Sequence, residues 1–131
     1  DCAAGPVARS DIKVSEIAFA ADGSLLVLER VTRSTRIHRV TLDPATRLPA
    51  RMADPAQRPT LEQLGQSGAA QAGLPLLAKT LVLSTDDLPE VCVDLEGLLV
   101  LDDGKLLLSN DSDYGIEGAE TQFWLAEADE G

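Results

Sequence analysis

Two Asp-Gly steps, each placed between two runs of apolar residues, constrain the fold of this chain more than any other feature of its sequence. The steps are Asp22-Gly23 and Asp103-Gly104. Both residue types tolerate the positive φ angles of a tight turn, so Asp-Gly between apolar runs is a strong signal for a β-hairpin. The strands predicted on either side of the two turns are residues 13–20, 24–31, 94–101 and 105–110.

Three further stretches rich in Leu or β-branched residues are predicted as strands, at 36–42, 79–84 and 122–127. The first of them follows strand 24–31 across a short polar link, 32–35, which completes a three-stranded antiparallel meander. The run from Asp22 to Leu28 lines up with the run from Asp103 to Ser109, about 81 residues later. A glutamate lies upstream of each turn, at Glu16 and Glu96, although these two differ in offset by one residue.

Repeated antiparallel meanders with Asp-Gly turns are typical of β-propeller blades. We therefore expect an all-β chain of about two four-stranded blades, with a β-sandwich as the alternative. Residues 1–131 would be a single partial propeller unit, with 12–42 as the first blade meander and 79–127 as the second blade. Because a propeller needs about four or more blades, the remaining ones would come from a companion fragment or from further copies of the chain.

The stretch 43–78 differs in character from the predicted strands around it. It contains five prolines and many Ala, Gln and Gly residues, which oppose continuous strand or helix. Thr60 and Gln63 have the spacing of a capping box, which predicts one short helix after Thr60. The stretch is therefore interpreted as a long insertion loop with a helical turn or two.

Charge is divided unevenly along the chain. Residues 1–85 contain ten Lys or Arg and eight Asp or Glu, a net charge of +2, whereas residues 86–131 contain fourteen Asp or Glu and one lysine, a net charge of −13. Such a field repels nucleic acid and attracts cations, although an acidic surface that only favours solubility would give the same balance. No apolar run reaches the length of a membrane span.

The cysteine usage favours an exported protein. Cys2 and Cys92 have the spacing of neither a zinc finger nor a redox motif. A disulfide between them would suit export, and two unpaired buried thiols are the alternative. The sequence starts at Asp1 without a methionine, as expected of a mature or cleaved product or of a piece of a longer chain. The expected location is extracellular, periplasmic or in the cell envelope.

An acidic loop, residues 110–120, follows the second predicted hairpin. Its carboxylates are separated by glycines and follow an asparagine, a pattern that suits Ca²⁺, which takes six to eight oxygen ligands in a flexible geometry. The loop is not an EF-hand, because its first glycine falls at the fifth position and no helical pattern flanks it. In the alternative interpretation, Asn110 and the aspartates only build turns. The carboxylates are Asp111, Asp113, Glu117 and Glu120.

The order of these motifs resembles the phytase-like family, whose activity is also described as esterase-like. The resemblance lies in Glu96-Gly97, the Asp-Gly turn at 103–104, a Leu-rich strand, and the segment from Asn110 to Tyr114-Gly115. The earlier unit, which ends in Glu29-Arg30, resembles another blade of that family. The similarity covers residues 12–42 and 79–126, and the family is a six-bladed type of propeller several hundred residues long.

The resemblance also implies a site. Phytase-type propellers use calcium to hold both the fold and a phosphate, and a phosphate needs Lys or Arg beside it. Arg30 is the expected phosphate contact, with Lys105 a poorer choice, whereas His38 is expected on a sheet surface. The catalytic candidates are Glu16, Glu29 and Arg30, and the metal candidates are Glu96, Asp111, Asp113 and Glu117.

Two functions follow as expectations. No Gly-x-Ser-x-Gly elbow is present, so the chemistry narrows to metal-assisted hydrolysis of a phosphoester or similar ester in a phosphorylated small molecule, with calcium as the cofactor. The alternative is a non-enzymatic extracellular or cell-envelope propeller scaffold in which calcium is structural. The scarcity of lysine and histidine favours that alternative.

Overall fold

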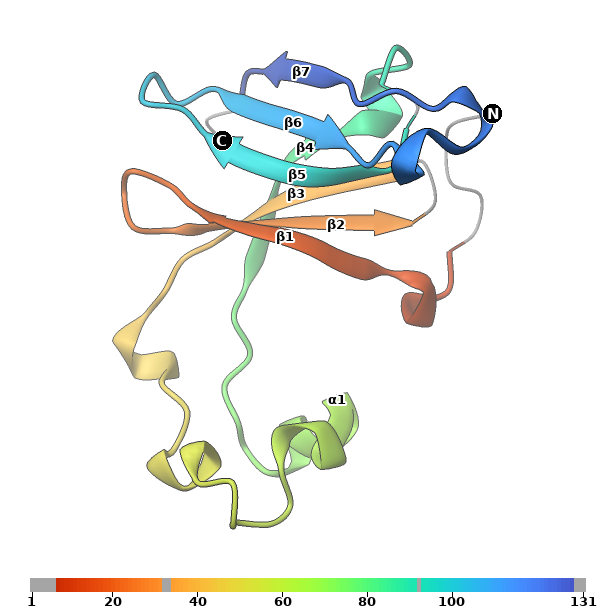
Figure 1. Cartoon of the computed structure of the whole chain (residues 1–131). Coiled ribbons are helices and arrows are strands. Elements are labelled where there is room, and N and C mark those ends of the chain that lie inside the picture. The colour runs from red at the N-terminus through yellow and green to blue at the C-terminus, as the bar shows by residue number, and fades with distance from the viewer. Residues whose placement is uncertain (1–6, 32–33, 92, 129–131) are drawn as a thin grey trace. The chain divides into compact units, whose positions relative to one another are not determined.

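The computed structural model describes residues 7–31, 34–91 and 93–128 (Figure 1). They divide into two compact units, one that contains all the described strands and one that spans Thr41–Ala78. The strands form two antiparallel sheets, which confirms the predicted all-β class. Each of the seven predicted strands is present, with ends that move by at most two residues. Among the described residues, no helix is long and apolar enough to cross a membrane.

The first sheet has four strands in sequential order. They are β1 (Lys13–Phe19), β2 (Leu25–Val31), β3 (Ser34–Val40) and β4 (Lys79–Ser84). Residues 79–84, predicted as part of the second blade, belong to the first sheet instead, because β4 pairs with β3 and places Lys79 opposite Val40. Backbone groups at the free edge of β3 need partners, and β4 supplies them across the insertion regardless of the distance along the chain.

The second sheet has three strands, also in sequential order (Figure 1). They are β5 (Leu95–Val100), β6 (Leu106–Asn110) and β7 (Phe123–Ala126). Short 3₁₀ helices flank the strands of the two sheets: η1 (Arg9–Asp11), η4 (Thr85–Asp87) and η5 (Asp113–Gly118). The last of these lies within the acidic loop between β6 and β7.

Both Asp-Gly steps form the predicted tight turns. The amide of Gly23 donates to the carbonyl of Ala20 at 3.0 Å, and the amide of Gly104 donates to that of Leu101 at 2.9 Å. The two glycines have φ angles of 82° and 84°, a conformation that a Cβ makes costly. The Asp22 carboxylate accepts hydrogen bonds from the hydroxyl and the amide of the serine two positions later, which lowers the pKa of Asp22.

The two hairpins have the same register, displaced by 81 residues. Phe19 pairs with Leu25 in the first, and Val100 pairs with Leu106 in the second. Every further pair of the β5–β6 ladder repeats a pair of the β1–β2 ladder at the same displacement. The internal repeat inferred from the sequence is therefore a repeat of backbone structure.

A β-bulge interrupts both ladders at the same point. The register shift encloses Ser15 in β1 and Glu96 in β5, so these two residues are equivalent. Glu16 is then equivalent to Gly97, in agreement with the one-residue offset between Glu16 and Glu96 in the sequence. A bulge bends its strand and redirects the side chain of the extra residue, and in β5 that side chain is a carboxylate.

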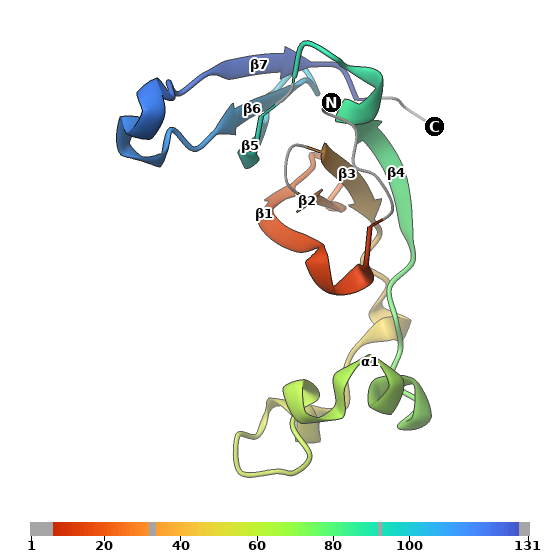
Figure 2. The same cartoon turned by 90° about the vertical axis from the view of Figure 1, so that its right-hand side faces the viewer.

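The hydrophobic core lies between the two sheets, which face each other in Figure 2. Of the two aromatic residues at the start of β7, Trp124 packs against this core while Phe123 is 66% exposed. The buried core residues are Leu26, Leu28, Ile37, Val82, Leu83, Val91, Leu95, Leu98, Leu106 and Leu108.

Equivalent residues of the two sheets point in opposite directions relative to this core. Leu28 is fully buried on the inner face of the first sheet, whereas its equivalent, Ser109, lies on the outer face of the second. Leu108 is fully buried in the second sheet, whereas its equivalent, Val27, lies on the outer face of the first. The two sheets thus follow one another like successive members of a stack, with the front of one against the back of the next. Two sheets related by a two-fold axis would instead bury equivalent positions.

Both outer faces expose large apolar side chains. Strand pairing places Val14, Ile17, Phe19 and Leu81 on outer face A, the side of the first sheet away from the core. It places Leu99, Phe123 and Leu125 on outer face B, the corresponding side of the second sheet. An antiparallel sheet with one solvated face normally alternates apolar and polar residues. These outer faces are therefore unlike those of a self-contained sandwich.

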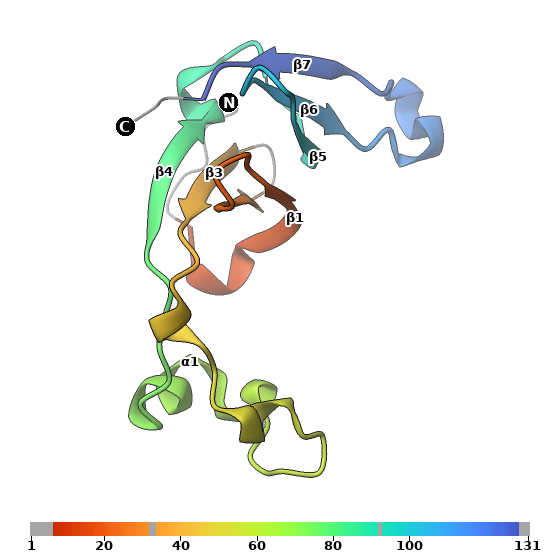
Figure 3. The same ribbon diagram turned by 90° about the vertical axis from the view of Figure 1, so that its left-hand side faces the viewer.

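The unit Thr41–Ala78 contains helical turns joined by extended chain (Figure 3). Its helices are η2 (Pro44–Thr46), η3 (Ala50–Ala53) and α1 (Leu61–Gln71). The predicted capping box is confirmed: the Thr60 hydroxyl accepts from the amide of Gln63, whose side chain accepts from the amide of Thr60. Gly65, at φ 58°, interrupts α1 after its first turn.

The predicted pairing of Cys2 with Cys92 lies outside the described residues, as does the 32–33 part of the polar link between β2 and β3.

Candidate functional site

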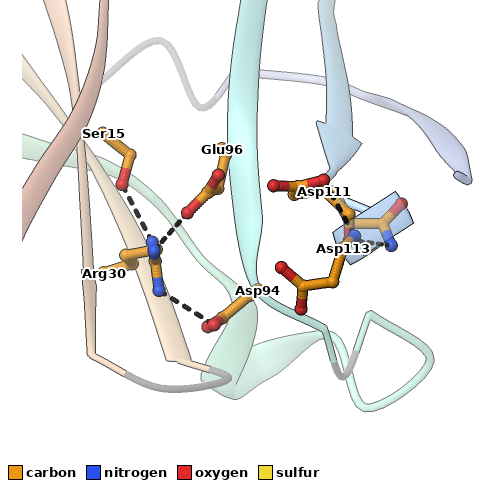
Figure 4. A network of polar contacts seen from close by, with 7 residues as sticks. Ser15, Arg30, Asp94, Glu96, Asp111 and Asp113 are labelled. Carbon is orange, nitrogen blue, oxygen red and sulfur yellow. Dashed lines mark hydrogen bonds and ion pairs between the residues drawn. The ribbon is translucent and has the colours of Figure 1, made fainter. Parts of the chain in front are cut away.

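Arg30 lies at the centre of a polar network between the two sheets (Figure 4). Its Nη1 is 2.9 Å from Oδ2 of Asp94, and its Nη2 forms an ion pair with Oε1 of Glu96. Its Nε donates to Oγ of Ser15 at 2.9 Å. Arg30 belongs to β2 and Glu96 to β5, so the guanidinium joins the two sheets directly.

The network has an excess of negative charge, because one guanidinium meets two carboxylates. The Arg30 side chain is only 12% exposed, and three of its nitrogen atoms already bind protein oxygens. A phosphate would have to displace Asp94 or Glu96 to take the contact that the sequence predicts for Arg30. The arrangement is that of a charge-assisted brace between sheets.

Glu29 is separated from Arg30, because neighbouring residues of a strand point to opposite faces. Its carboxylate lies on outer face A, where both oxygens are 2.5 Å from Nζ of Lys79. Nδ1 of His38, which lies on the neighbouring strand opposite Val27, is 3.6 Å from Oε2 of Glu29. The side chains of Glu29 and Arg30 therefore point to opposite faces of the sheet, although both residues line the pocket described below.

His38 titrates in an environment that disfavours its charged form. Burial lowers the pKa of His38 below its ordinary value of 6.5, and Lys79 and Arg36 act in the same direction, while Glu29 opposes them. The unfolded chain therefore binds this proton more tightly than the folded chain does. The contribution of His38 to stability is complete above pH 6.5 and is lost as the pH falls through the folded pKa.

We expect the free energy of unfolding to decrease as the pH is lowered from 7.5 to 5.5, and we expect a His38→Gln variant to show less of this decrease. Urea titrations of both proteins at several pH values within that interval measure the effect. The aspartates whose pKa values are lowered titrate below this interval. Parallel pH profiles for the two proteins would show that the proton is taken up elsewhere.

A pocket of about 380 Å³ adjoins this cluster on outer face A. Its lining includes the basic residues Arg9, Arg30, Arg36 and Lys79, together with His38 and Glu29. One of the cations, Arg36, forms an ion pair of 3.1 Å with Asp86 in η4. The balance of charge favours an anionic group in this pocket, although Glu29 offsets part of it.

The acidic loop is built as a series of turns. The Asn110 side chain donates to the carbonyls of Asp111 and Glu120 and accepts from the amide of Gln122, which ties both ends of the loop together. The Asp111 carboxylate accepts from the amide of Asp113 at 2.9 Å. These bonds are those of the turn-building interpretation.

Three of the predicted metal candidates, Glu96, Asp111 and Asp113, do not form one group in this arrangement. In Figure 4, Asp111 and Asp113 lie on the other side of β5 from Arg30, and no hydrogen bond or ion pair joins them to Glu96 within the described part of the chain. Among the described residues, no three His, Cys, Asp or Glu side chains form a metal-binding group. The side chain of Glu117 lies outside the described part.

Glu16 stands apart from the network as well. It is exposed, and its carboxylate accepts from the amide of Ile17. The residues that sequence reasoning missed are Asp94 and Ser15, which bind Arg30 instead. The sequence could have indicated Asp94, since it lies two positions before Glu96 and precedes the same strand. No sequence pattern indicated Ser15, because its place at the site depends on the bulge.

No known protein family, curated protein or solved structure matches this chain.

Proposed function

We propose that the chain is a scaffold module, two consecutive blades of an exported β-propeller whose outer faces are covered by further sheets. The observation that carries the proposal is the relation between the repeats. Positions that are buried in one sheet are on the outer face of the other. Blades of a propeller follow one another in this sense, because the front of each packs on the back of the next.

The spacing between the sheets supports the same arrangement. The first strands of the two sheets, β1 and β5, lie side by side (Figures 2 and 3). Away from them, a pocket of about 390 Å³ opens beside β4 and β7, where its lining includes Val82 and Trp124. Blades radiate from a central axis in this way, close at their inner strands and wider apart outside.

Imaging of the native particle by electron cryo-microscopy tests this proposal. We expect a ring in which a further sheet packs on each outer face. A particle with two sheets only, whose Phe19 and Phe123 side chains remain in solvent, would contradict it and would favour the sandwich alternative.

The second candidate function is the phytase-like hydrolysis of a phosphoester, with calcium bound by the acidic loop. The pocket lined by Arg9, Arg36 and Lys79 favours it, because these side chains are suited to a phosphate. The test is hydrolysis of p-nitrophenyl phosphate by the native particle with calcium and with a chelator. Calcium-dependent turnover that Lys79→Met reduces at least about tenfold would establish the enzyme. The absence of turnover under both conditions would favour the scaffold proposal.

A further inference from the structure

We infer that outer face B of one copy of the chain docks on outer face A of a second copy, with Asp111 of one copy facing Lys13 of the other. This interface rests on the proposed propeller arrangement and names the partner that covers the two faces. The inference follows from the 81-residue displacement between equivalent residues of the two sheets. The inner face of the first sheet is equivalent to outer face B, and the inner face of the second sheet is equivalent to outer face A.

The charged pair comes from the Arg30 network. At a displacement of 81 residues, Asp111 is the equivalent of Arg30, and Lys13 is the equivalent of Asp94. The existing ion pair of 2.9 Å between Arg30 and Asp94 thus has a counterpart with its charges exchanged. Glu96 becomes Ser15 in the same operation, so the counterpart has one cation and one anion without an extra carboxylate.

Both members of this counterpart are accessible. Lys13 and Asp111 are exposed, and neither forms an ion pair within the described part of the chain. A chain with a net charge of −11 repels its own copies in general. A specific lysine–aspartate contact at equivalent positions therefore favours one mode of association over others.

The apolar positions map in the same way. The residues of the second sheet that are buried against the first have apolar equivalents on outer face A: Leu95, Leu98, Leu106 and Leu108 correspond to Val14, Ile17, Leu25 and Val27. On outer face B, Leu99 and Leu107 correspond to Ala18 and Leu26, which face the core of the first sheet. Each outer face thus has the apolar pattern of the surface that already packs in the core.

An interface of this kind joins two different surfaces and is therefore heterologous, so copies add head to tail until the ring closes. Propellers have about four to eight blades. With two sheets in each chain, closure requires roughly two to four copies.

Exchange of charges tests the interface. Asp111→Lys places two lysines opposite each other, and Lys13→Asp places two aspartates opposite each other, so we expect each variant alone to associate at least about tenfold more weakly than the natural chain. A double variant that carries both exchanges in one chain restores an attractive pair at every junction, whatever the number of copies, and should recover the natural particle. Native mass spectrometry of the 131-residue chains, each 13.9 kDa, measures the number of copies directly.

Circular dichroism of each variant identifies one that fails to fold, and in that case Lys13→Glu, Asp111→Arg and their double variant serve for the same test. Recovery of two to four copies in the double variant, and in neither single variant, supports the interface. A natural chain that stays monomeric, or a folded double variant that does not recover, overturns it. A ring seen by microscopy whose extra sheets belong to a different chain would overturn the self-association while leaving the scaffold proposal intact.

Discussion

Leu108→Ala lowers the free energy of unfolding by about 3 kcal/mol, because it removes a fully buried side chain from between the two sheets. Leu108 pairs with Leu98 on one side and with Trp124 on the other. Removal of its side chain leaves a cavity that neither sheet can close without losing its register. The chain has one tryptophan, Trp124, whose fluorescence reports on this contact during a urea titration.

Leu76→Ala is the matched control, since Leu76 is 70% exposed and belongs to the unit Thr41–Ala78. It should change the unfolding free energy by no more than about 0.5 kcal/mol. Both titrations are made at one protein concentration, because binding to further sheets would make apparent stability depend on it. Equal losses in the two variants would mean that the two sheets do not share a core.

Arg30→Met is the second large effect, with an expected loss of about 2 kcal/mol in the free energy of unfolding. Methionine retains much of the volume of the side chain but leaves Asp94 and Glu96 without their cation at the junction between the sheets. Asp94 and Glu96 are themselves partly exposed, so water recovers part of the cost, and the loss stays below that of a fully buried pair.

Arg39→Met provides the comparison, because Arg39 forms a single ion pair of 2.9 Å with Asp22 at the surface of the first sheet. Its loss should be much smaller than that of Arg30→Met. A further variant, Glu96→Gln in the Arg30→Met background, should recover part of the stability by removing one of the two uncompensated charges. If Arg30→Met and Arg39→Met are equally mild, the Arg30 network does not brace the sheets.

The strands and turns were predictable because their signals are local. Each strand is encoded by a short run of apolar residues, and Asp22-Gly23 and Asp103-Gly104 supply the turn conformation from their own side-chain chemistry. The capping box of Thr60 and Gln63 is equally local. These predictions needed no knowledge of what lies across the sheet.

The candidate site was less accessible to prediction, because it depends on non-local register. The ladders show that Ser15 is the equivalent of Glu96, and no residue type in either strand announces the bulge at that position. Strand geometry predicts that Glu29 and Arg30 point to opposite faces of the sheet. Which of the two faces lies against Asp94 and Glu96 depends on the position of the second sheet. The pairing of β4 with β3 was missed for the same reason, since the insertion hides their proximity.

The insertion between β3 and β4 can change in length without disturbing the first sheet. Val40 and Lys79 are opposite each other in the ladder, so the backbone leaves the sheet and re-enters it at a single pair. The entropy of closing a loop rises only with the logarithm of its length, about 0.6 kcal/mol per doubling. Insertions, deletions and exchanges of segments at this pair thus leave strand register untouched. Length variation among descendants of this sequence should accumulate there, while the spacing within each hairpin stays constant.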